Sequence, residues 1–357
     1  MEASVAAGSS GVWSSEHVHP AEIDAALRGL ELECALEERA LAQARVLNLV
    51  VVVDREWKGE IANRLERVGR YHPSRTIMCA VERRKEDLDA WATLACDVPE
   101  GAGVALCREL VEIDMGEQHV ARLATIVDPV LVSDVLTMIW APHGHGAAVD
   151  ALLGLADVVL LDSVDEADAA TALARVAELA ERAYVVDLAW LRSTPWRERI
   201  AANFDPPAGR AMLGSLASVT VRHRPDSEVS ALLLLGWLAS RLGWQPAAMV
   251  ASASGRRGRA RAGKGEVKLA LEPDRTMPVP GLAGVTVETA QGETLSLDRG
   301  PGGLVAKRRN RQGAERSWRA LGASRGEGGI LGEGVRQALL RDPTYRPAIG
   351  GARSLLG

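Results

Sequence analysis

The sequence predicts an α/β protein, with an N-terminal doubly wound, mostly parallel sheet followed by a smaller α+β domain with an antiparallel meander. Over the first two hundred residues, short apolar runs alternate with helical segments, which is typical of parallel strands joined by right-handed crossovers. From about residue 266 the apolar runs are short and separated by Gly- and Pro-containing turns, which indicates antiparallel strands. With 357 residues, the chain is long enough for about two domains.

The pair Pro206-Pro207 lies between these two patterns and supplies the domain boundary, because prolines interrupt a helix. We expect a disordered leader over residues 1–19, since its first fifteen residues are small and polar. The α/β domain is expected over 20–207, the α+β domain over 208–345, and a tail over 346–357.

The α/β domain is expected to open with an amphipathic helix over residues 20–44, where Ile23, Leu27 and Leu30 recur at three- and four-residue steps. The valine-rich run 46–53 is typical of a strand buried on both faces of a parallel sheet. Further strands are expected at 75–81, 90–95, 103–111, 136–141, 158–162 and 184–188, and helices at 56–68, 118–127, 147–155 and 166–182. An acidic cluster is expected at the N-terminus of the last helix, where carboxylates interact favourably with the positive end of the helix dipole. It consists of Asp162, Asp165, Glu166 and Asp168.

The α+β domain is expected to begin with a strand at 217–222 and a strongly apolar helix at 228–242. Gly243 is placed to cap that helix and Pro246 to prevent its continuation. Short strands are expected at 266–271, 284–288, 293–297 and 303–307, and a last helix at 332–340 should cover one face of their sheet.

Composition narrows the class of protein. The net charge of −5 gives no overall field that would attract nucleic acid or an anionic membrane, so we expect neither as a partner. No apolar run approaches the ~20 residues of a membrane span, and no secretory signal opens the chain. The cysteines form no Cys-x-x-Cys pair, which indicates a reduced, cytoplasmic protein and leaves open any redox role of Cys34, Cys79, Cys96 and Cys107.

The most informative segment is Asp187–Ile200, which sets two tryptophans among arginines where a strand should turn into a helix. Thr194 is a good N-cap and Pro195 a good first helical residue. Trp and Arg dominate the binding hot spots of protein interfaces, and nothing in the segment is a poised nucleophile or general base. Two interpretations remain open: Trp190 and Trp196 pack a strand–helix corner, or they form a binding surface.

This segment, from Asp187-Leu-Ala-Trp190 into Thr194-Pro-Trp-Arg197, resembles the hallmark segment of the OpcA family of glucose-6-phosphate dehydrogenase assembly proteins. Three other segments are similar to the same family in the same order: 47–51, His72-Pro-Ser-Arg75, and 236–244. The resemblance implies a non-catalytic protein that binds glucose-6-phosphate dehydrogenase, promotes its assembly and active state, and so supports the oxidative pentose phosphate pathway as an allosteric activator.

Within these segments, residue type selects the candidates for binding the dehydrogenase. The first candidates are Trp190, Arg192, Trp196 and Arg197, and the second are Trp237, Arg241 and Trp244. An alternative for Trp237 is that it belongs to the core of its apolar helix.

Two other clusters have open interpretations. Arg75, with His72 nearby, either binds an anion such as phosphate or is a structural anchor to a buried carboxylate or to helix carbonyls. The segment 255–264 reads as a flexible basic loop, with Arg256, Arg257, Arg259 and Arg261. Such a loop is either solvated, bound to RNA, or docked on an acidic surface of the dehydrogenase.

No cofactor and no metal are expected. The chain has neither Gly-x-Gly-x-x-Gly nor Gly-Lys-Ser/Thr after its first parallel strand, so a dinucleotide cradle is not provided. His143 and His145 offer two imidazoles, fewer than a metal site needs. The competing function is an enzyme that binds a sugar phosphate or nucleotide at the carboxyl ends of the parallel strands.

Overall fold

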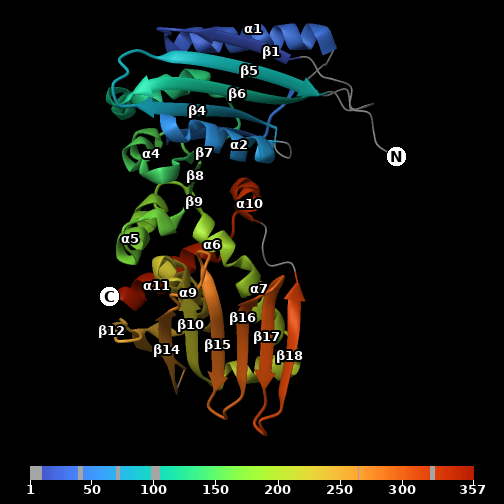
Figure 1. The fold of residues 1–357 in the computed structure, drawn as a ribbon, viewed down its shortest axis with the longest axis vertical. Helices are drawn as coiled ribbons and strands as arrows, with labels where there is room; N and C mark the ends of the chain where they lie inside the picture. Colours follow the sequence, from blue (N-terminus) through green and yellow to red (C-terminus); the bar gives the residue numbers. More distant parts are fainter. Residues whose placement is uncertain (1–9, 39–42, 70–72, 98–104, 264, 322–325) are drawn as a thin grey trace. The chain divides into compact units, whose positions relative to one another are not determined.

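The computed structural model describes residues 10–38, 43–69, 73–97, 105–263, 265–321 and 326–357 (Figure 1). Its internal contacts divide the chain into two compact units, which are described separately. Unit 1 consists of Met1–Leu161, Arg182–Val186 and Leu331–Leu339. Unit 2 consists of Asp162–Glu181, Asp187–Ile330 and Leu340–Gly357.

The first sheet is mostly parallel, as the sequence predicts. Its order is β1-β5-β6-β4-β3-β7-β8-β9, with β2 (Gln43–Ala44) beside β6. The strands are β1 (Ser10–Ser15), β3 (Leu47–Asp54), β4 (Ser74–Glu82), β5 (Asp89–Asp97), β6 (Ala105–Gly116), β7 (Leu136–Trp140), β8 (Val158–Leu161) and β9 (Tyr184–Asp187). Strands β6, β4, β3, β7 and β8 run parallel, whereas β5 is antiparallel to β6, and β1 to β5.

Strand β3 lies at the centre of this sheet. All of its residues are buried except Asp54 at its carboxyl end, which is the pattern of a strand covered on both faces. From β3 the chain passes through α2 (Lys58–Gly69) to β4 on one side, and the later strands β7 and β8 continue on the other. The strand order therefore reverses between β3 and β7.

Most predicted helices are present, with shifted bounds. They are α1 (Pro20–Glu38), α2, α4 (Gly146–Leu152) and α5 (Ala169–Leu179). The helix predicted at 118–127 is instead a 3-10 turn, Glu117–Arg122, followed by the short α3 (Leu123–Val127). The predicted acidic N-terminus is confirmed for Asp168, whose carboxylate accepts the Thr171 N–H as the N-cap of α5.

The predicted disordered leader is wrong for the described part of residues 1–19. Strand β1 pairs in register with β5, so backbone hydrogen bonds order a segment whose side chains are mostly small or polar. Gly11 leaves room for α1 there, because a Cβ at this position would lie 2.7 Å from the Leu30 side chain, which would have to shift. Residues 1–9 lie outside the described part.

The second sheet confirms the predicted antiparallel meander and adds strands to it. Its order is β11-β13-β14-β10-β15-β16-β17-β18, with β12 (Val250–Ser252) beside β13. The strands are β10 (Leu216–His223), β11 (Gln245–Pro246), β13 (Gly255–Ala262), β14 (Gly265–Pro273), β15 (Leu282–Thr289), β16 (Thr294–Gly300), β17 (Gly303–Arg309) and β18 (Glu315–Leu321). Every pair is antiparallel except β10 with β14.

The predicted flexible loop 255–264 is wrong, because Gly255–Ala262 is strand β13. It pairs with β14 along its whole length and with β12 and β11 on its other edge. Small residues allow this close packing: a Cβ on Gly258 would lie 2.7 Å from the Met249 side chain. The arginines of this segment interrupt the alternation of apolar and polar residues that would predict a strand from the sequence.

Helix α9 (Glu228–Leu242) has the bounds that the sequence predicts, and it packs against β10 and β14. Gly243 ends it in the left-handed region, with φ of 66°, and its N–H donates to the Ala239 carbonyl. This confirms the predicted glycine cap.

The predicted tail 346–357 is instead helix α11 (Tyr345–Leu356), which packs along α9 (Figure 1). Its buried residues recur at three- and four-residue steps and form one helix face: Tyr345, Ala348, Ile349, Ala352 and Leu355. The contact is close enough that a Cβ on Gly236 would lie 2.2 Å from the Ala348 carbonyl oxygen. Before it, α10 (Gly326–Leu340) begins earlier than the predicted helix at 332–340.

Candidate partner-binding site

The hallmark segment begins with a short helix that the sequence does not reveal. Helix α6 (Leu188–Arg192) starts directly after β9, with Asp187 as its N-cap. The prediction of Thr194 as N-cap is wrong by one position: α7 (Thr194–Phe204) begins at Thr194, after Ser193, with Pro195 in its first turn. Proline is tolerated there because its missing N–H has no partner in a first turn.

Asp187 is the centre of a buried polar network in unit 2. Its carboxylate accepts hydrogen bonds from the Ala189 N–H (2.9 Å), the Ser163 N–H (3.1 Å) and hydroxyl (2.7 Å), and the Tyr345 hydroxyl (2.7 Å). The residue is 1% exposed. Burial raises the pKa of this carboxyl, and the donated hydrogen bonds oppose the rise. Within unit 2, the network joins the N-terminus of α6 to the turn at Ser163 and to α11.

Trp190 and Arg197 are also buried and contact each other. The Arg197 guanidinium lies 3.5 Å from the centroid of the Trp190 ring, a cation–π contact. Asp342 accepts a hydrogen bond from the Trp190 indole N–H (2.9 Å) and pairs with Arg197 (3.4 Å). Burial lowers the pKa of Arg197 to about 10.

The remaining first candidates are engaged within the chain as well. Trp196 is 3% exposed, and Arg192 pairs with Asp162 at 2.6 Å. These contacts agree with the interpretation that the tryptophans pack a strand–helix corner. A role of Trp190, Arg192, Trp196 and Arg197 in binding a partner stays a prediction.

Asp162 makes the stability of unit 2 depend on pH. Burial raises the pKa of its carboxyl to about 7, although Arg192 opposes the rise. Between about pH 4, where an unfolded aspartate titrates, and pH 7, the folded state therefore holds more protons than the unfolded state. The free energy of unfolding should fall as pH rises through this window.

An Asp162→Asn variant, which does not titrate, should lose this slope. From pH 4 to pH 7, its free energy of unfolding should gain about 2–4 kcal/mol relative to the wild type, measured by urea unfolding at several pH values. Asp168→Asn is the matched control, because this exposed cap has a lowered pKa and titrates below the window. Parallel pH profiles for Asp162→Asn and the wild type would contradict the assignment of this pH dependence to Asp162.

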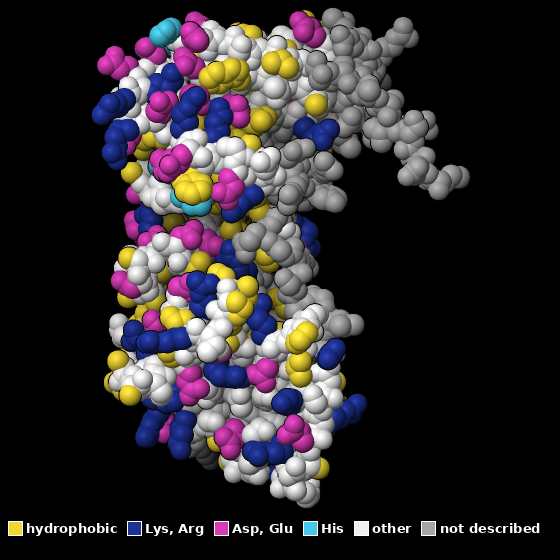
Figure 2. All heavy atoms as spheres, in the orientation of Figure 1, with side chains coloured by type: hydrophobic (Ala, Val, Ile, Leu, Met, Phe, Trp, Pro, Cys, Tyr) yellow, Lys and Arg dark blue, Asp and Glu magenta, His cyan; other side chains and the backbone are white. Residues whose placement is uncertain are grey.

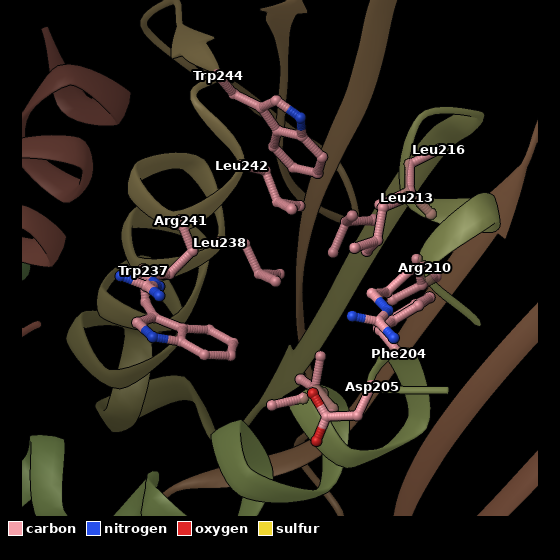
Figure 3. A pocket seen from close by; sticks show the side chains of 14 residues that line it. Phe204, Asp205, Arg210, Leu213, Leu216, Trp237, Leu238, Arg241, Leu242 and Trp244 are labelled. Carbon is pink, nitrogen blue, oxygen red and sulfur yellow. The ribbon is translucent and has the colours of Figure 1, made fainter. Parts of the chain in front are cut away.

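The second candidates, Trp237, Arg241 and Trp244, are brought together by the structure. They line a pocket of about 240 Å³ in unit 2, formed by α7, α8 (Pro207–Leu213), α9, β10 and β15 (Figure 3). Its apolar lining includes Ile200, Phe204, Leu213, Leu216, Leu238 and Leu242. Asp205, Arg210 and Arg241 supply its charged side chains.

The pocket has a buried lining and an exposed charged rim. Phe204, Leu238 and Trp244 are buried, whereas Arg210 and Arg241 are exposed. Figure 3 shows Trp237 and Arg241 projecting from α9 on one side and Arg210 from α8 on the opposite side. The guanidinium of neither arginine makes an ion pair or hydrogen bond within the described part of the chain. The pocket thus combines apolar surface with two cations available to a ligand.

Arg75 shows the contacts of a structural anchor. It is 5% exposed and donates to the carboxylates of Glu109 and Glu31 and to the Val130 carbonyl (2.9 Å). Arg45 also pairs with Glu109, so the buried acid is neutralised by two guanidiniums. His72 lies outside the described residues, and anion binding by this pair stays a prediction.

The arginines of β13 are paired rather than available. Arg256 contacts Glu228 at 2.6 Å, Arg257 contacts Glu272 at 2.8 Å, and Arg259 contacts Glu266 at 2.9 Å. Arg261 donates to the side-chain oxygen of Gln245. On the face shown in Figure 2, cationic and anionic side chains are likewise interspersed. This arrangement reduces the case for docking of a partner through β13.

The carboxyl ends of β3 and β7 are where the competing enzymatic function would place its ligand, since the strand order reverses there. At this position, side chains of the loop that follows β3 contact side chains of the loop that follows β7. Trp57 stacks on His143, with ring centroids 5.0 Å apart, and His145 Nε2 lies 3.2 Å from the Asp54 carboxylate. His143 is held in the left-handed region, at φ 62°. A ligand between these loops would have to separate both contacts.

Other candidate sites contribute little. Within the described residues, no three His, Cys, Asp or Glu side chains are grouped as metal ligands. Cys34 and Cys79 are buried, and burial raises the pKa of Cys79 to about 12, which disfavours the reactive thiolate. The side chains of Cys96 and Cys107 lie outside the described part. No helix among the described residues has the length and apolar character needed to cross a membrane.

Comparison with solved structures gives only a distant similarity. Two structures of apo scyllo-inositol dehydrogenase from Lactobacillus casei match at TM-scores of 0.45 and 0.43, with 12% identity. Each match covers 88% of this chain and 96% of the other. This similarity is too distant to indicate function.

Comparison with known sequences is more specific. OpcA proteins of the OxPP cycle from Synechocystis, Nostoc punctiforme and Synechococcus elongatus are 25%, 27% and 26% identical over 181 residues. The alignments cover 49% of this chain and 38%, 39% and 41% of the relatives, so the chain spans about two fifths of the length of the curated relatives it matches.

Two family models match in succession and cover most of the chain. The glucose-6-phosphate dehydrogenase subunit N-terminal domain of OpcA matches residues 65–178, and the corresponding C-terminal domain matches residues 183–349. The hallmark segment and the pocket both lie within the second match. The chain therefore belongs to the OpcA family of glucose-6-phosphate dehydrogenase subunits.

Proposed function

We propose that this protein is a non-catalytic assembly factor and allosteric activator of glucose-6-phosphate dehydrogenase, acting in the cytoplasm to support the oxidative pentose phosphate pathway. The observation that carries the proposal is the pocket of unit 2. It gathers Trp237, Arg241 and Trp244, which are the residue types of binding hot spots, around one apolar recess. Family membership names the enzyme that this surface would bind.

The competing function, a sugar-phosphate- or nucleotide-binding enzyme, is favoured less. The loops that follow β3 and β7 would have to part around a ligand, yet they are joined by the Trp57–His143 stack and by the Asp54–His145 contact. The segment after β3 also lacks the glycines that let a backbone approach a pyrophosphate. These features support an accessory role over catalysis in this crevice.

Activation requires a difference in affinity. A protein without chemistry of its own raises the activity of an enzyme only by binding its active arrangement more tightly than its inactive one. A ~100-fold preference corresponds to about 2.7 kcal/mol of differential binding, which a few well-packed Trp or Arg contacts can supply.

The test is a titration of purified glucose-6-phosphate dehydrogenase from the same organism with this protein. We expect no dehydrogenase activity from the protein alone, and a saturable, several-fold rise in the activity of the mixture. Light scattering should show a larger assembly over the same concentration range. Serum albumin at equal concentration is the control for non-specific stabilisation. Unchanged activity and assembly size at saturation would refute the proposal.

A further inference from the structure

We infer that the pocket of unit 2 binds a polypeptide segment that places a large apolar side chain next to a carboxylate. The inference rests on the proposed function for the identity of the partner and adds the chemistry that the partner must present. The size, charge and hydrogen-bond donors of the pocket each support it.

The volume of the pocket favours a side chain over a whole small molecule. At about 240 Å³, it is smaller than the pockets of about 300–1,000 Å³ that enclose drug-sized ligands. Its apolar lining, with Phe204, Leu238 and Trp244 buried, suits an apolar group that leaves water. A single anchor inserted into such a recess is the usual form of an interface hot spot.

The charges of the pocket favour a carboxylate beside that side chain. Arg210 and Arg241 are exposed and make no ion pair within the part of the chain that the structure describes, and Asp205 is the only acid in the lining. The arginines of β13 at 256, 257 and 259, in contrast, each contact a glutamate. A guanidinium presents a planar fork of donors that matches a carboxylate. The rim of the pocket therefore offers a partner positive charge that these three arginines of β13 do not.

The indole N–H groups favour a polypeptide as the ligand that carries both the apolar side chain and the carboxylate. Among the described residues, no acceptor faces the indole N–H of Trp237 or of Trp244, whereas that of Trp190 donates to Asp342. A buried or half-buried indole usually finds an acceptor, and a bound segment offers backbone carbonyls as well as its carboxylate.

The first test uses two probes that differ in one charge, N-acetyl-phenylalanine and its C-terminal amide. Both are titrated into the ¹⁵N-labelled protein, and the indole signals are assigned by single Trp→Phe variants. We expect N-acetyl-phenylalanine to shift the signals of Trp237 and Trp244, to leave that of Trp190 unchanged, and to bind at least fivefold more tightly than the amide. Equal affinities, or shifts confined to other tryptophans, would overturn the inference.

Variants assign the charge preference to the rim. Arg210→Gln/Arg241→Gln should reduce the affinity for N-acetyl-phenylalanine to that for the amide. The control Arg259→Gln/Arg261→Gln removes two exposed arginines of β13 and should change the affinity less than twofold. A loss of the same size in both double variants would overturn the inference, because it would indicate a general effect of net charge.

Binding of the variants to the dehydrogenase tests this inference separately from the proposed function. Arg210→Gln/Arg241→Gln should bind the enzyme at least tenfold more weakly, and the control variant within twofold of the wild type. Equal binding of both variants would overturn the inference and leave the proposed function intact. If the wild type failed to bind the enzyme while the probes gave the expected result, the proposed function would fail and the pocket chemistry would stand. Self-association that Arg210→Gln/Arg241→Gln abolishes would identify a second copy as the occupant and overturn the assignment to a partner.

Discussion

Replacing Gly236 by alanine is expected to lower the free energy of unfolding of unit 2 by about 3 kcal/mol. The added Cβ would lie 2.2 Å from the Ala348 carbonyl oxygen and 2.5 Å from the Ala352 nitrogen. Both are backbone atoms of α11, so neither can rotate away, and the two helices would have to separate. Urea unfolding followed by circular dichroism measures the change.

Gly350→Ala is the matched control for this prediction. Gly350 lies in α11 itself, but its Cβ would meet no atom within 4 Å. Alanine is the better helix former by about 0.8–1 kcal/mol, so this variant should be slightly more stable than the wild type. Similar stabilities for Gly236→Ala and Gly350→Ala would show that the close approach of α9 and α11 is not required.

Asp187→Ala is expected to destabilise the protein by about 3–5 kcal/mol. The substitution removes the acceptor of four hydrogen bonds from Ala189, Ser163 and Tyr345, and a buried donor without a partner costs about 1–3 kcal/mol. The same unfolding experiment measures the loss. Asp187→Asn retains one acceptor oxygen and should lose less.

Asp168→Ala provides the comparison for Asp187→Ala, because Asp168 also caps a helix but is exposed. Loss of such a cap costs about 1 kcal/mol. If Asp187→Ala cost no more than Asp168→Ala, the buried network would contribute little beyond the cap of α6.

Local patterns in the sequence were sufficient for the elements whose stability is itself local. The valine run of β3 and the apolar helix α9 with its glycine cap are fully described by composition and period. The same patterns missed β1, β13 and α11. Strand β1 is held by pairing with the distant β5, and α11 by its contact with α9, so their own sequences carry little of the signal. Strand β13 pairs with its sequence neighbours β12 and β14, but its arginines replace the apolar alternation that would predict a strand.

The candidate site illustrates the same limit. Residue type singled out the tryptophans and arginines, but it could not distinguish buried side chains from accessible side chains. The side chain that engages Trp190 and Arg197 is Asp342, which is 152 and 145 positions away. Trp237, Arg241 and Trp244 line one pocket because α9 carries the first two and the third directly follows its cap, Gly243; their role in binding stays a prediction.

The packing of α11 has a genetic consequence. Helix α11 supplies the Tyr345 hydroxyl, which donates a hydrogen bond to Asp187, and the backbone atoms against which Gly236 packs. A nonsense codon just ahead of Tyr345 would keep every residue that precedes α11, yet it would expose the apolar face of α9 and leave the buried Asp187 carboxylate short of a donor. Such a truncation should behave as a null allele, because its product would be cleared by proteolysis rather than accumulate.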